Sequence, residues 1–361
     1  MAERSIVVVG AGIVGASLAY HLSGQGRPVT LIDAGLPGSG VTRASFAWIG
    51  RPVSSDRPSA ALRYLALDEY RRLEAELPGL AIRWTGSLVW DGFDDNPGPF
   101  ADDVGRLEPR LVDPPAEATH HAGDAAFDPV AATELLVATA RERGARLLVG
   151  TTATALEHHA GAAISGERPG DAVTGEEHQA GKVIGVRTTN GTIPAETVVL
   201  AAGTGSVGLC AGVGVTLPVE PSPAILVRLR ATPGLVRAIV ATPALEARQL
   251  DDGTVLAPTI YSGETDQAAL LATAGRVRDR FAAAFRGAGD AKVLSAEIGW
   301  RPMPVDDEPI IGTPAGTEGL YVAVMHSGIT LAAAVGRLAA AEIITGQPAP
   351  ELEGCRPTRF S

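Results

Sequence analysis

The sequence predicts an α/β fold in which a domain built on a parallel sheet is interleaved with a second domain rich in β-strands. The first observation behind this prediction is an apolar strand at residues 6–9, which leads through glycines into a helix at residues 16–23. The second is a buried strand at residues 198–203 that ends on glycine. The third is a strand at residues 319–324 that precedes an apolar helix at residues 329–344. Since these units stand at both ends and in the middle of the 361 residues, we expect the two domains to share the chain in alternating pieces.

A glycine-rich turn follows the first predicted strand. Residues 10–15 read Gly-Ala-Gly-Ile-Val-Gly, and Asp33 follows the next predicted strand, residues 28–32. In such a unit the first glycine allows the turn, the second lets the backbone approach a pyrophosphate, and the third lets the helix pack on the strand. The helix N-terminus attracts phosphates, and the carboxylate accepts hydrogen bonds from ribose hydroxyls. This order predicts a Rossmann-type dinucleotide site, although the pattern does not separate FAD from NAD. We assign to the site Gly10, Gly12, Ile13, Val14, Gly15, Asp33 and Ala34.

The composition excludes several classes of function. With 30 Lys and Arg against 41 Asp and Glu, a net charge of −11 and no basic stretch, the chain is not expected to bind nucleic acid. A hydrophobic content of 45% with 20% charged residues is typical of a globular protein. The apolar runs at residues 6–22 and 331–344 are interrupted by glycines or by Arg337 and Glu342, so we predict neither a signal peptide nor a membrane span.

The cysteine content also limits the interpretation. Cys210 and Cys355 are the only cysteines, and neither has a neighbour at metal-ligand spacing. We therefore expect reduced thiols, a cytoplasmic location and no metal site. A polar insertion at residues 157–182 contains three histidines, but no cysteine or carboxylate ligands converge there at fixed spacing. A solvated hairpin is the favoured interpretation of this insertion.

Further helices and strands are predicted between these units. Apolar residues at steps of three to five predict a helix at residues 59–77. Another is expected at residues 128–143, because Asp128 can cap it and Pro129 suits its first turn. The remaining predicted elements are a helix at residues 267–285 and short strands at residues 82–84, 87–90 and 146–149.

Six ordered segments together resemble the D-amino-acid oxidase superfamily of FAD-dependent amine and amino-acid oxidoreductases. They are residues 10–15 with Asp33; Gly38-Ser39-Gly40 before Thr42-Arg43-Ala44-Ser45; Asp128-Pro129; residues 198–203; Gly299-Trp300-Arg301-Pro302 through Asp306 to residues 309–312; and His326-Ser327-Gly328-Ile329. The resemblance covers nearly the whole chain. It implies an FAD-binding domain at residues 1–80, 128–215 and 298–361, and a substrate-binding domain at residues 81–127 and 216–297.

The resemblance also implies which residues hold FAD. The flavin and pyrophosphate contacts fall on Gly40, Thr42, Arg43, Ala44 and Ser45, with Ala47 and Trp48 running past the isoalloxazine. The adenine, ribose and pyrophosphate contacts fall on Ala153, Ala202, Gly203 and Thr204. The segment His326, Ser327, Gly328, Ile329 and Thr330 leads into the last helix, whose N-terminus is expected to face the flavin. The backbone of that segment, rather than the imidazole, is expected to make the contact, and a purely structural role for His326 stays open. Covalent relatives attach FAD through a cysteine within residues 299–303, and none is present, so we expect non-covalent FAD.

Arg301 is the residue that the resemblance places in the reaction. It implies a bidentate pair between this arginine and the substrate carboxylate above the flavin. The alternative is a buried ion pair between Arg301 and Asp306 or Glu297. The implied reaction is hydride transfer to flavin N5 from the carbon that bears an amine, giving an imine that water hydrolyses, with no dedicated catalytic base.

Substrate and electron acceptor are less well defined by the sequence. The resemblance implies a small amino acid or amine as substrate, and oxygen or an unknown acceptor. No lysine falls in the strand at residues 255–260, where oxygen-activating relatives carry one, yet we favour an oxidase over a dehydrogenase. The alternatives are a 2-hydroxy-acid dehydrogenase of the same fold and a flavin-binding subunit that needs a partner. Candidate pocket residues are Trp48, Trp84, Trp90, Trp300, Tyr261 and Arg248, the last of which would favour an acidic substrate.

Overall fold

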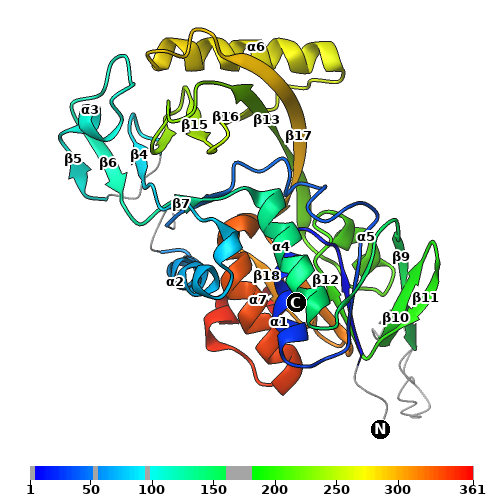
Figure 1. Ribbon diagram of the computed structural model, residues 1–361. Helices are drawn as coiled ribbons and strands as arrows, with labels where there is room; N and C mark the ends of the chain where they lie inside the picture. Colours follow the sequence, from blue (N-terminus) through cyan, green and yellow to red (C-terminus); the bar gives the residue numbers. More distant parts are fainter. Residues whose placement is uncertain (1–4, 52–55, 94–97, 160–180, 361) are drawn as a thin grey trace, which may run out of the picture.

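A computed structural model describes residues 5–51, 56–93, 98–159 and 181–360, and it confirms the predicted α/β class. A six-stranded sheet forms the lower part of the molecule in Figure 1. Its order is β18 (Ile310–Gly312), β19 (Leu320–Val324), β12 (Thr197–Leu200), β1 (Ile6–Val9), β2 (Val29–Ile32) and β8 (Arg146–Leu148). All neighbours in this sheet are parallel except β18 and β19.

Alternation along β1 explains why this strand is apolar throughout. Ile6 and Val8 pack into a core with the helices α1 (Ile13–Gly24), α4 (Pro129–Glu142) and α7 (Gly328–Thr345). Val7 and Val9 pack into a second core on the opposite face. That core contains residues of α5 (Gly205–Ala211) and of a three-stranded sheet formed by β9 (Ala153–His159), β10 (Lys182–Thr188) and β11 (Gly191–Pro194). A strand buried on both faces has no polar position, as parallel sheets require.

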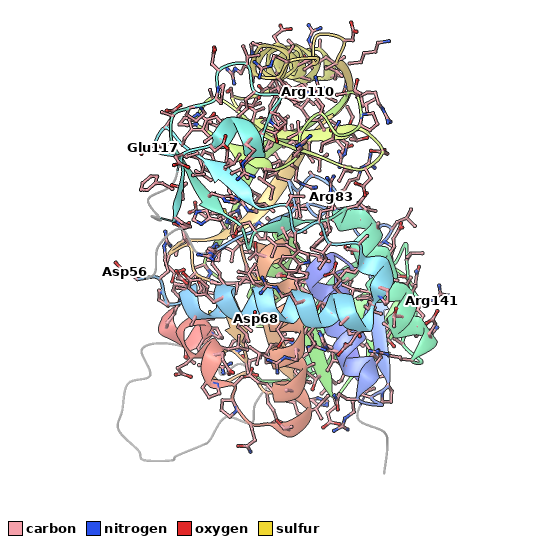
Figure 2. The ribbon with its side chains drawn as sticks, turned by 60° about the vertical axis from the view of Figure 1, so that its left-hand side comes forward. Asp56, Asp68, Arg83, Arg110, Glu117 and Arg141 are labelled. Atoms are coloured by element: carbon pink, nitrogen blue, oxygen red, sulfur yellow. The ribbon has the colours of Figure 1, made fainter. Side chains whose placement is uncertain are left out.

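The helix α2 (Ala60–Glu76) packs against α7 on the outside of this lower part. In the view of Figure 2 it lies across the front of the molecule, and its Asp68 side chain is 74% exposed. The opposite face of α2 is buried through residues such as Leu62, Ala66 and Leu73. The amphipathic pattern that predicts this helix therefore corresponds to one face toward α7 and one toward solvent.

An eight-stranded sheet forms the upper part, and α6 (Gln267–Ala284) lies across its top in Figure 1. The strand order is β17 (Lys292–Pro304), β13 (Val219–Arg230), β16 (Thr254–Ile260), β15 (Glu246–Gln249), β14 (Ile239–Ala241), β4 (Ser87–Val89), β6 (Ala118–His121) and β5 (Phe100–Ala101). Phe281 of α6, together with Phe285, anchors the core of this part. The remaining elements are β3 (Trp48–Ile49), β7 (Ala125–Ala126), α3 (Val104–Leu107), η1 (Pro78–Leu80), η2 (Pro350–Cys355) and η3 (Pro357–Phe360).

Several predicted boundaries differ from the structure. The predicted strand at residues 82–84 is absent: Arg83 makes only an isolated bridge with Ala126. The first helix begins at Ile13 rather than Ala16, because it starts directly after the turn. The strand β17 runs without interruption across the predicted domain boundary at residue 298, so Arg301 belongs to the eight-stranded sheet.

The polar insertion is framed by two paired strands. β9 and β10 are antiparallel, with Lys182 opposite His159. The residues between them, 160–180, which include His178, lie outside the described part of the chain.

Among the described residues, α7 is the one helix that is long and apolar enough to cross a membrane by length and composition. However, 67% of it is buried within the protein, where it packs against α1 and α2. Its apolar character is thus that of a core helix.

The contact between α1 and α7 depends on Gly336. A Cβ at this position would lie 2.8 Å from the Cβ of Ser17, whose hydroxyl donates a hydrogen bond to the Ala332 carbonyl at 2.7 Å. We expect Gly336→Ala to lower the free energy of unfolding by about 1–3 kcal/mol through overpacking. Chemical denaturation measures this. The control is Gly275→Ala in α6, where nothing lies within 4 Å of an added Cβ and no loss of stability is expected. Equal stability of both variants would contradict close packing at Gly336.

Candidate active site

A cavity of about 450 Å³ lies where the N-termini of α1 and α7 approach the eight-stranded sheet. Its walls come from the turn before α1, residues 41–51, the strands β15 and β17, and the loop before α7. The predicted site residues that line it are Gly12, Ile13, Val14, Thr42, Ala44, Ser45, Ala47, Trp48, Gly203, Arg301, His326, Ser327, Gly328, Ile329 and Thr330. Five segments of the sequence, residues 12–14, 42–48, 203, 301 and 326–330, are thus brought together.

The other predicted site residues do not line this cavity. They are Gly10, Gly15, Asp33, Ala34, Gly40, Arg43, Ala153, Ala202 and Thr204. Asp33 lies behind the turn, where one carboxylate oxygen accepts from Ala11 N and the other from Gly35 N, each at 2.7 Å. Arg43 donates to Glu297 at 2.8 Å, and its side chain is 56% exposed.

The three glycines of the turn have different structural roles. Gly10 has a φ of +102°, and a Cβ there would lie 2.5 Å from the Ala201 carbonyl oxygen. A Cβ at Gly15 would collide with the carbonyl of Gly10. At Gly12 the only atom near an added Cβ is Thr42 Oγ1, at 3.2 Å. The first and third glycines therefore serve the fold, and the second leaves open space toward the cavity.

The loop before α7 is held in place from two elements. Ser327 adopts a left-handed conformation with φ 59°, and its hydroxyl accepts a hydrogen bond from Arg63 of α2 at 2.7 Å. The Tyr70 hydroxyl donates to the Ile329 carbonyl. Thr330 donates to the Trp48 carbonyl at 3.0 Å. These contacts fix the helix N-terminus, which carries a positive dipole, against the cavity.

His326 lines the same cavity as a neutral side chain. Burial lowers its pKa to about 4, and the positive charges of Arg301 and Arg63 act in the same direction. At neutral pH the imidazole is therefore uncharged, and its Nδ1 lies 3.5 Å from the Ser327 hydroxyl.

Arg301 presents its guanidinium from β17. Its Nη2 donates to the Ser222 hydroxyl at 2.7 Å, and its Nε donates to the Ser222 carbonyl at 3.2 Å. The alternative ion pairs are not formed. Glu297 instead accepts from Arg43 at 2.8 Å and lies 3.4 Å from Arg228, and Asp306 accepts from Arg359 at 2.7 Å. The Arg301 side chain is thus oriented by Ser222 while its charge remains unpaired within the described residues.

Sequence reasoning missed Glu246, which lines the cavity from β15. Burial raises the pKa of its carboxyl to about 7, and Arg301 opposes that shift. The sequence instead singled out Arg248, two residues further along the strand. Arg248 is only 3% exposed, and its guanidinium donates to the carbonyls of Phe46 and Phe127, the latter at 2.9 Å. It does not line the cavity, so the prediction that Arg248 lines the substrate pocket is wrong, and the preference for an acidic substrate that depended on it has no support.

Of the aromatic candidates only Trp48 lines the cavity. Its indole Nε1 donates to Asp124 Oδ2 at 2.9 Å, and the same oxygen accepts from Ser87 at 2.8 Å. The rings of Trp48 and Phe93 are stacked with centroids 6.4 Å apart. Asp124, His121 and Arg63 also line the cavity. None of these three residues was predicted from the sequence, because nothing in the local sequence distinguishes them from ordinary polar residues.

The residues present fit an FAD molecule. The first turn of α1 leaves N–H groups without intrahelical partners, and Gly12 keeps the space beside them free for a pyrophosphate. Each carboxylate oxygen of Asp33 retains a lone pair for a ribose hydroxyl. The α7 N-terminus supplies a second positive end for the flavin ring.

A dinucleotide-binding turn beside a cavity with an oriented arginine is typical of oxidoreductases that use a nucleotide cofactor. The chain belongs to the family described as FAD dependent oxidoreductase (DAO), whose sequence model matches residues 5–342. This confirms the family resemblance and FAD as the cofactor.

Two groups of relatives carry different names. A glycine oxidase from Bacillus licheniformis is 24% identical over 365 residues, covering 95% of this chain and 93% of the relative. A D-amino acid dehydrogenase from Cereibacter sphaeroides is 27% identical over 415 residues, covering 96% and 93%. Among solved structures, the L-proline dehydrogenase of P. horikoshii is similar with a TM-score of 0.80 and 22% identity, covering 99% of this chain and 98% of that chain. That structural likeness concerns the fold.

Proposed function

We propose that this protein oxidises a small amino acid or amine, with FAD as the redox cofactor and an imine as the product that water hydrolyses. The single observation that carries the proposal is Arg301, a guanidinium held by Ser222 and directed at the cavity. The names of the relatives, glycine oxidase and D-amino acid dehydrogenase, support an amino-acid substrate.

The chain's own residues would bind and orient the substrate. When bound, FAD supplies a hydride acceptor at flavin N5. Arg301 pairs with the substrate carboxylate, and its planar fork fixes the direction of the α-carbon. The neutral imidazole of His326 and the indole of Trp48 line the same space without adding charge. Because Arg301 is partly buried, its contact with a carboxylate is stronger than it would be in bulk solvent.

We propose that the two sheets divide these tasks. The part with the six-stranded sheet would hold FAD, through α1 and α7. The part with the eight-stranded sheet would supply the substrate wall, through Arg301 on β17 and Glu246 on β15.

We propose the cytoplasm as the compartment of this protein. Cys210 and Cys355 are both buried and form no disulfide, which suits a reducing environment.

We favour oxygen as the electron acceptor, with a different acceptor as the alternative. The lysine that oxygen-activating relatives carry has no counterpart among the described residues at this cavity, which keeps the alternative acceptor open. Lys182 forms an ion pair with Glu318, and Lys292 begins β17. The test is reoxidation of the reduced holoenzyme by air compared with an artificial acceptor such as a quinone. Rapid return of the flavin absorbance in air supports an oxidase, and reoxidation only by the quinone supports a dehydrogenase.

The substrate class is tested by anaerobic bleaching of the flavin with a panel of amino acids, amines and 2-hydroxy acids. We expect bleaching by at least one amino acid or amine. Arg301 would bind a 2-hydroxy acid equally well, so bleaching by hydroxy acids alone would replace the proposal with that alternative. If no donor bleaches the flavin, the interpretation as a subunit that needs a partner is favoured.

The purified protein should be yellow, and acid precipitation should release free FAD into the supernatant. The physical reason is that residues 299–303 contain no cysteine, while Cys210 and Cys355 are buried outside the cavity lining. Absorbance of the supernatant and pellet measures this. Colour that stays in the pellet would show a covalent bond.

A further inference from the structure

Glu246 belongs to the proposed substrate wall, but the proposed reaction does not specify which group of the substrate its carboxylate contacts. Within the described residues its carboxylate makes no hydrogen bond and no ion pair, although it is partly withdrawn from solvent. By contrast, Asp124, the other acidic side chain of the lining, accepts from Trp48 and Ser87. An unpaired carboxylate that is partly withdrawn from water is costly, and a cationic ligand would offset that cost.

Arg301 and Glu246 place opposite charges on one sheet. Their strands, β17 and β15, are separated by β13 and β16. The pairing register places Glu246 level with Glu297, four residues before Arg301 on β17. The two backbones are therefore three strand spacings apart across the sheet and four residues apart along it, about 20 Å on a flat sheet. Both side chains line the same cavity, and the positive charge of Arg301 lowers the pKa of the Glu246 carboxyl against the effect of burial. A ligand with a carboxylate at one end and a positive charge toward the other complements this arrangement.

We propose that Glu246 binds an ammonium group of the substrate, opposite the carboxylate that Arg301 binds, and so selects amino acids over 2-hydroxy acids. This inference rests on the proposed function. A hydroxyl cannot neutralise the buried carboxylate, whereas an ammonium forms a charge-assisted hydrogen bond with it. A ligand with a carboxylate alone adds a second negative charge to the cavity.

The test compares wild-type holoenzyme with Glu246→Gln, which keeps the shape and removes the charge. Anaerobic stopped-flow reduction gives the dissociation constant of an amino acid, and perturbation of the flavin spectrum gives that of acetate. We expect Glu246→Gln to weaken amino-acid binding by about 10- to 100-fold. Acetate should bind as well as to the wild type, or more tightly. Two pairs of amino acids distinguish which ammonium group Glu246 binds. Weaker binding of alanine and glycine in the variant indicates the α-ammonium, and weaker binding of lysine and ornithine alone indicates the ammonium at the end of the side chain.

The matched control is Glu117→Gln, which removes the same charge from an exposed position just before β6, labelled in Figure 2. It should leave both dissociation constants unchanged. If Glu246→Gln weakens alanine, lysine and acetate alike, or none of them, the inference is overturned while amino-acid oxidation still stands. If only lactate or glycolate reduces the wild-type flavin, the proposed function fails and this inference fails with it.

A second variant, Glu246→Asp, keeps the charge on a shorter side chain. It should show an intermediate loss of amino-acid affinity, and it tests the inference if the glutamine variant does not fold.

A pH series gives a second readout. The other charged or titratable groups that line the cavity are Arg51, Arg63, His121, Asp124, Arg301 and His326. Burial raises the pKa of Glu246 to about 7, so the carboxyl is increasingly protonated below that pH. Wild-type affinity for an ammonium-bearing ligand should therefore rise as the pH increases through about 7, and the rise should be absent in Glu246→Gln. The same rise in both proteins would overturn the inference.

Discussion

Replacing Arg301 by alanine is expected to leave the flavin spectrum nearly unchanged while it lowers both substrate affinity and the rate of flavin reduction. A charge-assisted bidentate contact in a water-poor cavity contributes about 2–4 kcal/mol, or roughly 30- to 1000-fold. The rate falls along with the affinity, because a loose carboxylate also misaligns the reacting C–H bond. Anaerobic stopped-flow measurement at several substrate concentrations separates the two effects.

Arg301→Lys should restore little of the activity, since one ammonium cannot fix the plane of a carboxylate. A suitable control is Arg110→Ala, which removes an exposed arginine from the upper part of the molecule and should change neither quantity (Figure 2). Unchanged reduction kinetics in Arg301→Ala would mean that the substrate carries no carboxylate at this position. Loss of folding would instead indicate that the contacts with Ser222 are mainly structural.

Replacing Gly12 by valine is expected to abolish retention of FAD by a protein that still folds. A Cβ at this position meets only Thr42 Oγ1 at 3.2 Å, so the fold needs a shift of only a few tenths of an ångström to accept it. The added methyl groups would occupy the space beside the α1 N-terminus that a pyrophosphate needs. The ratio of flavin to protein absorbance after purification, together with circular dichroism, measures both parts of this prediction.

Two further glycine variants separate cofactor loss from damage to the fold. Gly15→Ala should destabilise the protein itself, because its Cβ collides with the Gly10 carbonyl. Gly275→Val in α6 should retain both fold and flavin, since its surroundings are open. Stoichiometric flavin in Gly12→Val would place the pyrophosphate elsewhere.

Local sequence signals predicted some elements closely. Asp128 caps α4 by accepting from Val130 N and Ala131 N, with Pro129 at the first position, as the sequence indicates. The four apolar residues 6–9 form β1 as expected. These features depend on backbone dihedrals and on hydrogen bonds between near neighbours, which a short stretch of sequence specifies. The small edge strands, such as β5 with only two residues, carry no comparable signal.

The sequence by itself determined the turn at residues 10–15 and, through six short motifs in order along the chain, the family. It also singled out Arg301, which lies within one of those motifs. Only the tertiary structure decided which side chains share the cavity. Glu246 and Arg248 lie two residues apart on β15, yet one faces the cavity and the other is bound by the carbonyls of Phe46 and Phe127. Arg63 reaches Ser327 across 264 residues of sequence. The alternation of polar and apolar residues determines which face of a strand or helix is buried. Packing between segments that are distant in the sequence decides which side chains meet on that face, and the candidate site consists of such side chains.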